Sequence, residues 1–263
     1  MLNVINPQAD LRRRGSIRRI GVRRRPLMRL VCFPWCGAGA SVFRRLAASL
    51  PDHIEPLAVQ LPGREDRFGE KLLRRMDEVV AHILDDTVAL LDRPLVLFGH
   101  SMGAIVAYEV ARTLKQRIGR EPDALIVSGH GSPCAGPRTS KSWHTADEDA
   151  FIANILQLGG TPSVVLNDRD MMRMFIPVLK ADYEVLETHV HRPPLPLLSC
   201  PLVACAGKQD AEVTPDTLHA WSRLTTGPSH VHWFEGDHFY LCAQPETLTR
   251  HIEQWSALVP AAV

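Results

Sequence analysis

The segment Val96–Ile105 reads VLFGHSMGAI and places Ser101 between two glycines, directly after an apolar run. The pattern Gly-x-Ser-x-Gly is typical of a sharp turn from a strand into a helix, where small flanking residues let the two elements pack closely. The preceding Leu95–Phe98 has the composition of a buried strand, and residues 102–116 repeat apolar side chains at helical spacing. We therefore predict a nucleophilic serine at the tip of this turn. An idle serine in a glycine-rich loop is the alternative.

The rest of the chain alternates strand-like runs with helical patterns. The runs are rich in valine and leucine without strict alternation, as expected of a parallel sheet covered on both faces. They are Leu30–Phe33, Leu57–Leu61, Leu95–Phe98, Ala124–Ser128, Leu202–Ala206 and His230–Phe234. A further helical pattern covers residues 245–259, with Pro245 suited to its first turn. This order predicts an α/β fold with a mostly parallel central sheet flanked by helices.

The interval between Ser128 and Leu202 is too long for a simple connection and has a mostly helical pattern. We interpret residues 133–197 as a helical lid, inserted over the edge of the sheet where the parallel strands end. Within it, Thr145–Glu148 is a capping-box sequence that predicts the start of a helix. A second helix is predicted over residues 168–187, and Pro177 is expected to kink or divide it.

The N-terminal segment differs in charge from the rest of the chain. Residues 1–29 hold nine of the 30 basic residues and one of the 29 acidic ones, so residues 30–263 carry a formal charge of −7. Because the segment lacks aromatic residues and any amphipathic period, we predict a disordered arm over residues 1–28, followed by one domain over residues 29–260. A tether to nucleic acid or to a membrane is the alternative. We expect neither partner.

Composition and cysteine usage favour an ordinary cytoplasmic protein. The chain is 45% hydrophobic and 22% charged, and it shows no apolar signal core and no run of the roughly 18–20 apolar residues that span a bilayer. Its six cysteines form no Cys-x-x-Cys pair. Cys32, Cys200 and Cys205 lie in or beside apolar runs, so we expect reduced core thiols and no metal site.

An activated serine needs a base, and the base needs an acid that orients it. In folds that use this turn, the acid and then the histidine follow the serine along the chain. Asp210 comes shortly after the run Leu202–Ala206, and His238 comes shortly after His230–Phe234. We predict Ser101 as nucleophile, His238 as base and then acid, and Asp210 as the orienting acid. Glu212 is the nearest alternative acid. Asp237 ranks lower because it should point away from His238.

The oxyanion of an acyl-transfer reaction needs two preorganised N–H donors. One should be the backbone N–H of Met102, the residue after the nucleophile, and the other should come from the loop after the first core strand. That loop contains Cys36, whose backbone N–H we predict as the second donor. A nucleophilic role for the Cys36 thiol is disfavoured because Ser101 already occupies the turn.

Five segments together resemble the type II thioesterases of polyketide and nonribosomal peptide biosynthesis, within the α/β-hydrolase superfamily. The resemblance spans about residues 29–258 and rests on FPWCGAG (33–39), QLPGREDR (60–67), FGHSMGA (98–104), LGGTP (158–162) and GDHF (236–239). The family usually has His-Ala where this chain has Trp35-Cys36. This difference leaves the three predicted catalytic residues untouched but changes the entrance to the acyl pocket.

The resemblance implies an α/β-hydrolase fold and hydrolysis of acyl thioesters held on the phosphopantetheine arm of acyl or peptidyl carrier proteins. It implies no cofactor of the enzyme's own, and nothing in the sequence suggests an obligate oligomer, so we expect a monomer. The residues alone are less specific. They also fit a general carboxylesterase or lipase-like hydrolase, or a non-catalytic binding protein that keeps the hydrolase fold.

The lid is a candidate for substrate contact because it holds a cluster of flexible side chains. Met171, Met172, Met174 and Phe175 lie close together in it, and methionines adapt to varied apolar ligands. We predict Met171, Met174 and Phe175, with Trp35, as substrate-binding residues. The alternative is that the lid cluster only packs the lid onto the core.

Overall fold

One seven-stranded sheet organises the chain in the computed structural model, which describes residues 15–136, 142–158, 169–191 and 196–256. The strand order is β1-β3-β2-β4-β5-β6-β7, in which β1 is antiparallel to β3 and all other neighbours are parallel. The strands are β1 Ile17–Arg19, β2 Met28–Phe33, β3 Ile54–Val59, β4 Leu95–His100, β5 Ala124–Ser128, β6 Leu202–Gly207 and β7 Ser229–Phe234. All six predicted strands are confirmed, as is the α/β class.

Helices cover both faces of the sheet because strand side chains alternate between two apolar clusters. In β4, Val96 and Phe98 join one cluster, whereas Leu95 and Leu97 join the other. The first cluster is closed by α2 Arg44–Ser49, α9 Tyr240–Ala243 and α10 Pro245–Ser256, and the second by α3 Met76–Val88, α4 Met102–Ile118 and α8 Pro215–His219. The short 3-10 helices are η1 Ala40–Phe43, η2 Glu65–Arg67, η3 Pro133–Ala135, η4 Trp143–Thr145 and η5 Ala220–Leu224.

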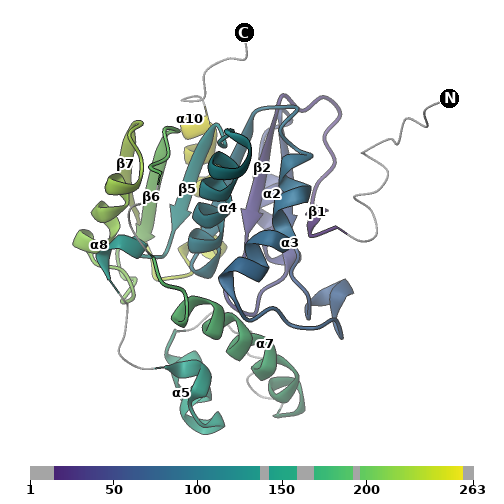
Figure 1. Cartoon of the computed structure of the whole chain (residues 1–263), viewed down its shortest axis with the longest axis vertical. Coiled ribbons are helices and arrows are strands. Elements are labelled where there is room, and N and C mark those ends of the chain that lie inside the picture. Colours follow the sequence, from purple (N-terminus) through teal and green to yellow (C-terminus); the bar gives the residue numbers. More distant parts are fainter. Residues whose placement is uncertain (1–14, 137–141, 159–168, 192–195, 257–263) are drawn as a thin grey trace, which may run out of the picture.

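The lid lies beyond the edge at which the parallel strands end, at the bottom of Figure 1. Within the described residues it contains η4, α5 Glu148–Leu158 and α7 Arg169–Glu187. A separate apolar cluster joins its helices, formed by Phe151, Ile155, Met172, Ile176 and Leu179. The chain therefore has a second, smaller core outside the sheet.

Two local expectations about the lid need correction in part. Pro177 does not divide α7, since one missing intrahelical hydrogen bond does not end a helix that packs along its length. The predicted start of a helix is confirmed by α5, which begins at Glu148, but its cap is not the expected residue. The start of α5 is capped by Asp147, whose Oδ1 accepts the backbone N–H of Ala150 at 2.9 Å. Thr145, the predicted cap, instead donates its hydroxyl to the carbonyl of Ser142.

The predicted disordered arm must be corrected for residues 15–28; residues 1–14 lie outside the described part of the chain. Ile17 is buried and pairs with Val59 as β1 extends the sheet. Arg18 forms an ion pair with Asp66, and Arg19 forms one with Glu55. The basic segment thus finds its counter-charges on distant parts of the sequence, which local charge counting does not reveal. In the described residues no helix has the length and apolarity needed to cross a membrane.

Candidate active site

The turn after β4 holds Ser101 in a backbone conformation that few residues adopt. Its φ is +55° and its ψ is −119°, and its backbone N–H donates to the carbonyl of Ser128 at 2.8 Å. A Cβ at Gly99 would lie 2.1 Å from the carbonyl oxygen of Gly103, and a Cβ at Gly103 would lie 2.0 Å from that of Phe33. Both contacts are with backbone, which cannot move aside. The predicted tight turn from strand to helix is present, and strain of about 1–3 kcal/mol at such a residue is typical of functional sites.

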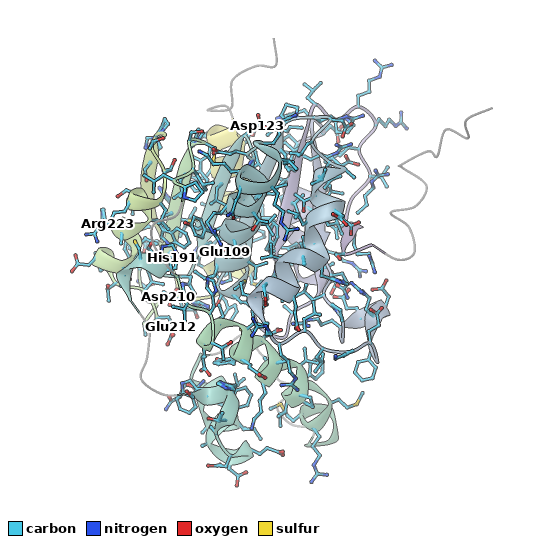
Figure 2. The ribbon with its side chains drawn as sticks, in the orientation of Figure 1. Glu109, Asp123, His191, Asp210, Glu212 and Arg223 are labelled. Atoms are coloured by element: carbon cyan, nitrogen blue, oxygen red, sulfur yellow. The ribbon has the colours of Figure 1, made fainter. Side chains whose placement is uncertain are left out.

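Asp210 and His238 meet at the ends of two neighbouring strands. Asp210 follows β6 and His238 follows β7, and the ring Nδ1 donates to the Asp210 Oδ2 at 2.8 Å. The Asp210 side chain is fully buried, and its Oδ1 accepts the backbone N–H of Glu212 at 2.9 Å. In Figure 2, Asp210 and Glu212 lie at the end of the sheet that faces the lid. This arrangement fixes the ring so that its Nε2 is the free nitrogen.

The two alternative acids are placed differently. Asp237 is exposed, and its Oδ1 accepts the backbone N–H of Phe239, whereas the ring of His238 bonds to Asp210. Glu212 is half-buried and lines the cavity described next, but its backbone N–H supports the Asp210 carboxylate. Of the three acids, Asp210 is therefore the one that holds His238.

A cavity of about 1470 Å³ lies between the sheet edge and the lid and is lined by both Ser101 and His238. Trp35, Met174 and Phe175, three of the predicted substrate contacts, also line it. Met174 and Phe175 are 54% and 39% exposed, whereas Met172 is buried in the lid cluster. The side chain of Met171 lies outside the described residues. Two histidines of the lid's return segment, His189 and His191, line the cavity too. The Nε2 of His189 lies 3.1 Å from Oε1 of Glu109.

His100 is fully buried beside His238, with ring centroids 4.9 Å apart. Its Nδ1 lies 2.8 Å from the hydroxyl of Ser128, which lies 2.7 Å from the hydroxyl of Tyr240. Burial and the nearby His238 hold the pKa of His100 well below its ordinary value. Trp35 packs edge-on against His100, with ring centroids 5.6 Å apart.

The two predicted oxyanion donors lie on adjacent segments. Met102 is the first residue of α4, and the first N–H groups of a helix have no acceptor within it. Cys36 lies in the loop 34–41 that follows β2 and lines the same cavity as Ser101. The register pairs Phe33 with Gly99, so this loop and the serine turn leave neighbouring strands side by side.

Side chains from elsewhere hold the loop 34–41, an arrangement the sequence did not reveal. The backbone N–H of Gly37 donates to Asp182 Oδ2 of α7 at 2.7 Å, that of Ala40 donates to Gln60 at 2.6 Å, and that of Ser41 donates to Glu65 at 3.0 Å. Arg64 is buried and forms an ion pair with Asp182. The available signal was the acidic Asp182, three residues after Leu179 on the apolar side of the lid helix.

Metal-ligand geometry is not found in the described part of the chain, where no three His, Cys, Asp or Glu side chains gather to hold an ion. What this site can do chemically follows from its serine, its oriented histidine and the backbone N–H groups of the two predicted oxyanion donors. Such a set transfers acyl groups through a covalent acyl-serine.

Comparisons with known proteins show which family the chain resembles. A family model of the thioesterase domain matches residues 28–256. Thioesterase PikA5 of Streptomyces venezuelae is 39% identical, over 86% of this chain and 79% of that protein. The gramicidin S biosynthesis protein GrsT of Aneurinibacillus migulanus is 36% identical, over 81% of this chain and 83% of its own length. Among solved structures, the type II thioesterase BorB from the borrelidin biosynthetic cluster matches with a TM-score of 0.84 and 35% identity, over 92% of this chain and 97% of that one.

Proposed function

The chain belongs to the thioesterase family, and on this basis we propose that it releases acyl groups from the phosphopantetheine arm of acyl or peptidyl carrier proteins in polyketide or nonribosomal peptide synthesis. Relatives from such pathways support this substrate class. The observation that carries the proposal is that one cavity is lined both by a serine with a strained backbone and by a histidine held by an aspartate.

In the proposed mechanism, Ser101 Oγ attacks the thioester carbonyl while His238 Nε2 accepts its proton. The C–S bond then breaks, and His238 returns the proton to the departing phosphopantetheine sulfur, which leaves an acyl-serine. Water, deprotonated by the same histidine, then attacks the acyl-serine. The bond between the acyl carbon and Ser101 Oγ breaks, His238 returns the proton to Oγ, and the free acid leaves. Asp210 keeps the ring oriented and stabilises the imidazolium that forms in each half-reaction.

The negative charge on the carbonyl oxygen is stabilised in this proposal by the backbone N–H groups of Met102 and Cys36. Losing one such donor lowers the rate by about 10²–10³-fold in well-studied hydrolases. The mechanism requires no metal or organic cofactor of the enzyme's own, because the phosphopantetheine belongs to the carrier. We place the enzyme in the cytoplasm as a monomer.

A general carboxylesterase on the same fold is the second candidate, since the site geometry also suits oxygen esters. The test compares hydrolysis of one acyl group on a phosphopantetheinylated carrier protein with hydrolysis of the matching small oxygen ester, with Ser101→Ala beside each. Preferential release from the carrier that is lost in the variant is the expected result. Turnover of the oxygen ester alone would instead identify an esterase, and equal rates in wild type and variant would overturn the serine mechanism.

A further inference from the structure

The lid helix α7 directly contacts the loop 34–41 that carries one proposed oxyanion donor. Asp182 accepts the backbone N–H of Gly37, the residue after Cys36, at 2.7 Å. Leu179, one helical turn earlier on the same side of α7, fills the space over Gly37, where an added Cβ would lie 2.6 Å from its Cδ2. A change in the position of α7 therefore acts on the peptide next to the donor.

Arg64 fixes the Asp182 carboxylate in turn. Its Nη2 donates to the same Oδ2, and its Nη1 donates to the carbonyl of Pro62 at 2.7 Å. The Asp182 and Arg64 side chains are only 2% and 5% exposed. Removing two charges from water has a large desolvation penalty, which a simple lid contact does not require. An apolar pair would attach the lid equally well but would not accept the N–H of Gly37.

We propose that Asp182 is a positioning residue that sets the direction of the Cys36 N–H, so that the rate of the chemical step depends on the lid being seated. This inference rests on the proposed function, because it assigns Cys36 a role in stabilising the oxyanion. Arg64 supports it by preventing the carboxylate from rotating away from Gly37. In this proposal the lid has two roles. It forms a wall of the cavity, and its position affects the rate of the chemical step.

The test measures kcat and KM for a small acyl thioester, acyl-N-acetylcysteamine, so that carrier docking does not enter. We expect Asp182→Ala to lower kcat by about 10–100-fold, less than the full loss of an oxyanion donor, with KM nearly unchanged. Asp182→Asn retains an acceptor oxygen for Gly37 and should restore most of the rate. Affinity for an acyl trifluoromethyl ketone, whose serine adduct places an oxyanion at the same point, should fall in parallel with kcat.

Glu55→Ala is the matched control because it also removes the acid of a buried ion pair. Glu55 pairs with Arg29 at 3.1 Å at the beginning of β3 and β2, the opposite edge of the sheet from the cavity. Both alanine variants should lower the melting temperature, but only Asp182→Ala should lower kcat. If Asp182→Ala does not fold, the double variant Arg64→Met/Asp182→Leu replaces the pair with apolar groups, a change that buried ion pairs often tolerate. That variant should show the same loss of kcat.

Equal kcat losses in the Asp182 and Glu55 variants would overturn the inference, as would a change confined to KM or an Asp182→Asn variant as slow as Asp182→Ala. In the double variant, an unchanged kcat would overturn it too. Ser101→Ala separates this outcome from failure of the proposed function. If Ser101→Ala is inactive while Asp182→Ala is normal, only the coupling is wrong, whereas an active Ser101→Ala would refute the mechanism itself.

Discussion

At the edge of the sheet, Ser101 and its flanking glycines are held by contacts between backbone atoms, whereas α7 of the lid contacts Gly37 through the side chains of Leu179 and Asp182. A Cβ at Gly99 or Gly103 would lie only 2.1 or 2.0 Å from a backbone oxygen, so no other residue fits there, and the Asp210–His238 pair is buried. The lid has its own small apolar core and presents exposed Met174 and Phe175 to the same cavity. The comparison teaches that the reactive groups are fixed by backbone geometry, while the part that meets the acyl chain can be changed by exchanging side chains.

The largest effect is expected at the buried acid of the sheet edge. Asp210→Asn should lower kcat by about 10⁴-fold, because the amide no longer holds the histidine in the productive tautomer. The loss of kcat is measured by steady-state hydrolysis of the carrier-bound acyl group. Asp237→Asn, which changes the exposed neighbouring acid, should leave kcat unchanged. If the two variants lost the same activity, the assignment of the orienting acid would be wrong.

The second-largest effect is expected on stability, at Gly103 in the turn that holds the serine. Gly103→Ala should destabilise the fold by about 3 kcal/mol, because its Cβ meets the carbonyl of Phe33. Gly119→Ala is the control: Gly119 has φ +67° at the end of α4 but open space around it, so only the left-handed conformation opposes a side chain, by about 1–2 kcal/mol. Chemical denaturation compares the two. A Gly103→Ala variant as stable as Gly119→Ala would show that the turn can relax.

Stability should fall in acid because of His100. Its pKa is well below the ordinary 6.5 in the folded protein, so below that pH the unfolded chain binds a proton that the folded chain does not. The free energy of unfolding should therefore decrease as pH falls below about 6.5, by up to about 1.4 kcal/mol per pH unit from this residue. His100→Gln should make the decrease shallower in denaturation measured from pH 7 to pH 5. Equal slopes in the two proteins would contradict the burial argument.

The smallest effect is expected in the lid. Met174→Ala and Phe175→Ala should each reduce the preference for long over short acyl chains by a few fold, since one buried methylene contributes about 0.8 kcal/mol and these side chains are half-exposed. Ratios of kcat/KM across a series of acyl chain lengths measure this preference. Leu156→Ala is the control, because Leu156 is a similarly exposed lid residue that does not line the cavity. A chain-length preference that does not change, or that changes equally in Leu156→Ala, would limit the lid cluster to packing.

The sheet and the serine turn were predictable because short-range rules determine them. The valine- and leucine-rich runs became the six parallel strands, and the glycines at 99 and 103 indicated a backbone contact that the structure contains. The order of serine, acid and histidine along the chain indicated which strand ends would meet. These signals are local in sequence or follow from sheet topology.

Interactions between distant charges were not predictable in the same way. Arg64 finds its partner 118 residues away in Asp182, and the arginines of β1 pair with acids in other elements. From sequence alone, a charged residue is predicted to be exposed unless its partner is known. The residues next to it in the sequence do not identify a partner that lies far away in the chain. The capping of α5 by Asp147 rather than Thr145 also depended on how η4 ends, which propensity does not fix.

The central claim is that Ser101, activated by His238, is the residue that takes up the acyl group. A long-chain alkyl fluorophosphonate reacts with an activated serine and does not turn over, so peptide mapping after labelling locates the nucleophile directly. The account predicts one label per chain, on Ser101, that is lost in Ser101→Ala and greatly slowed in His238→Ala. A label on another residue, or labelling that does not require His238, would contradict it.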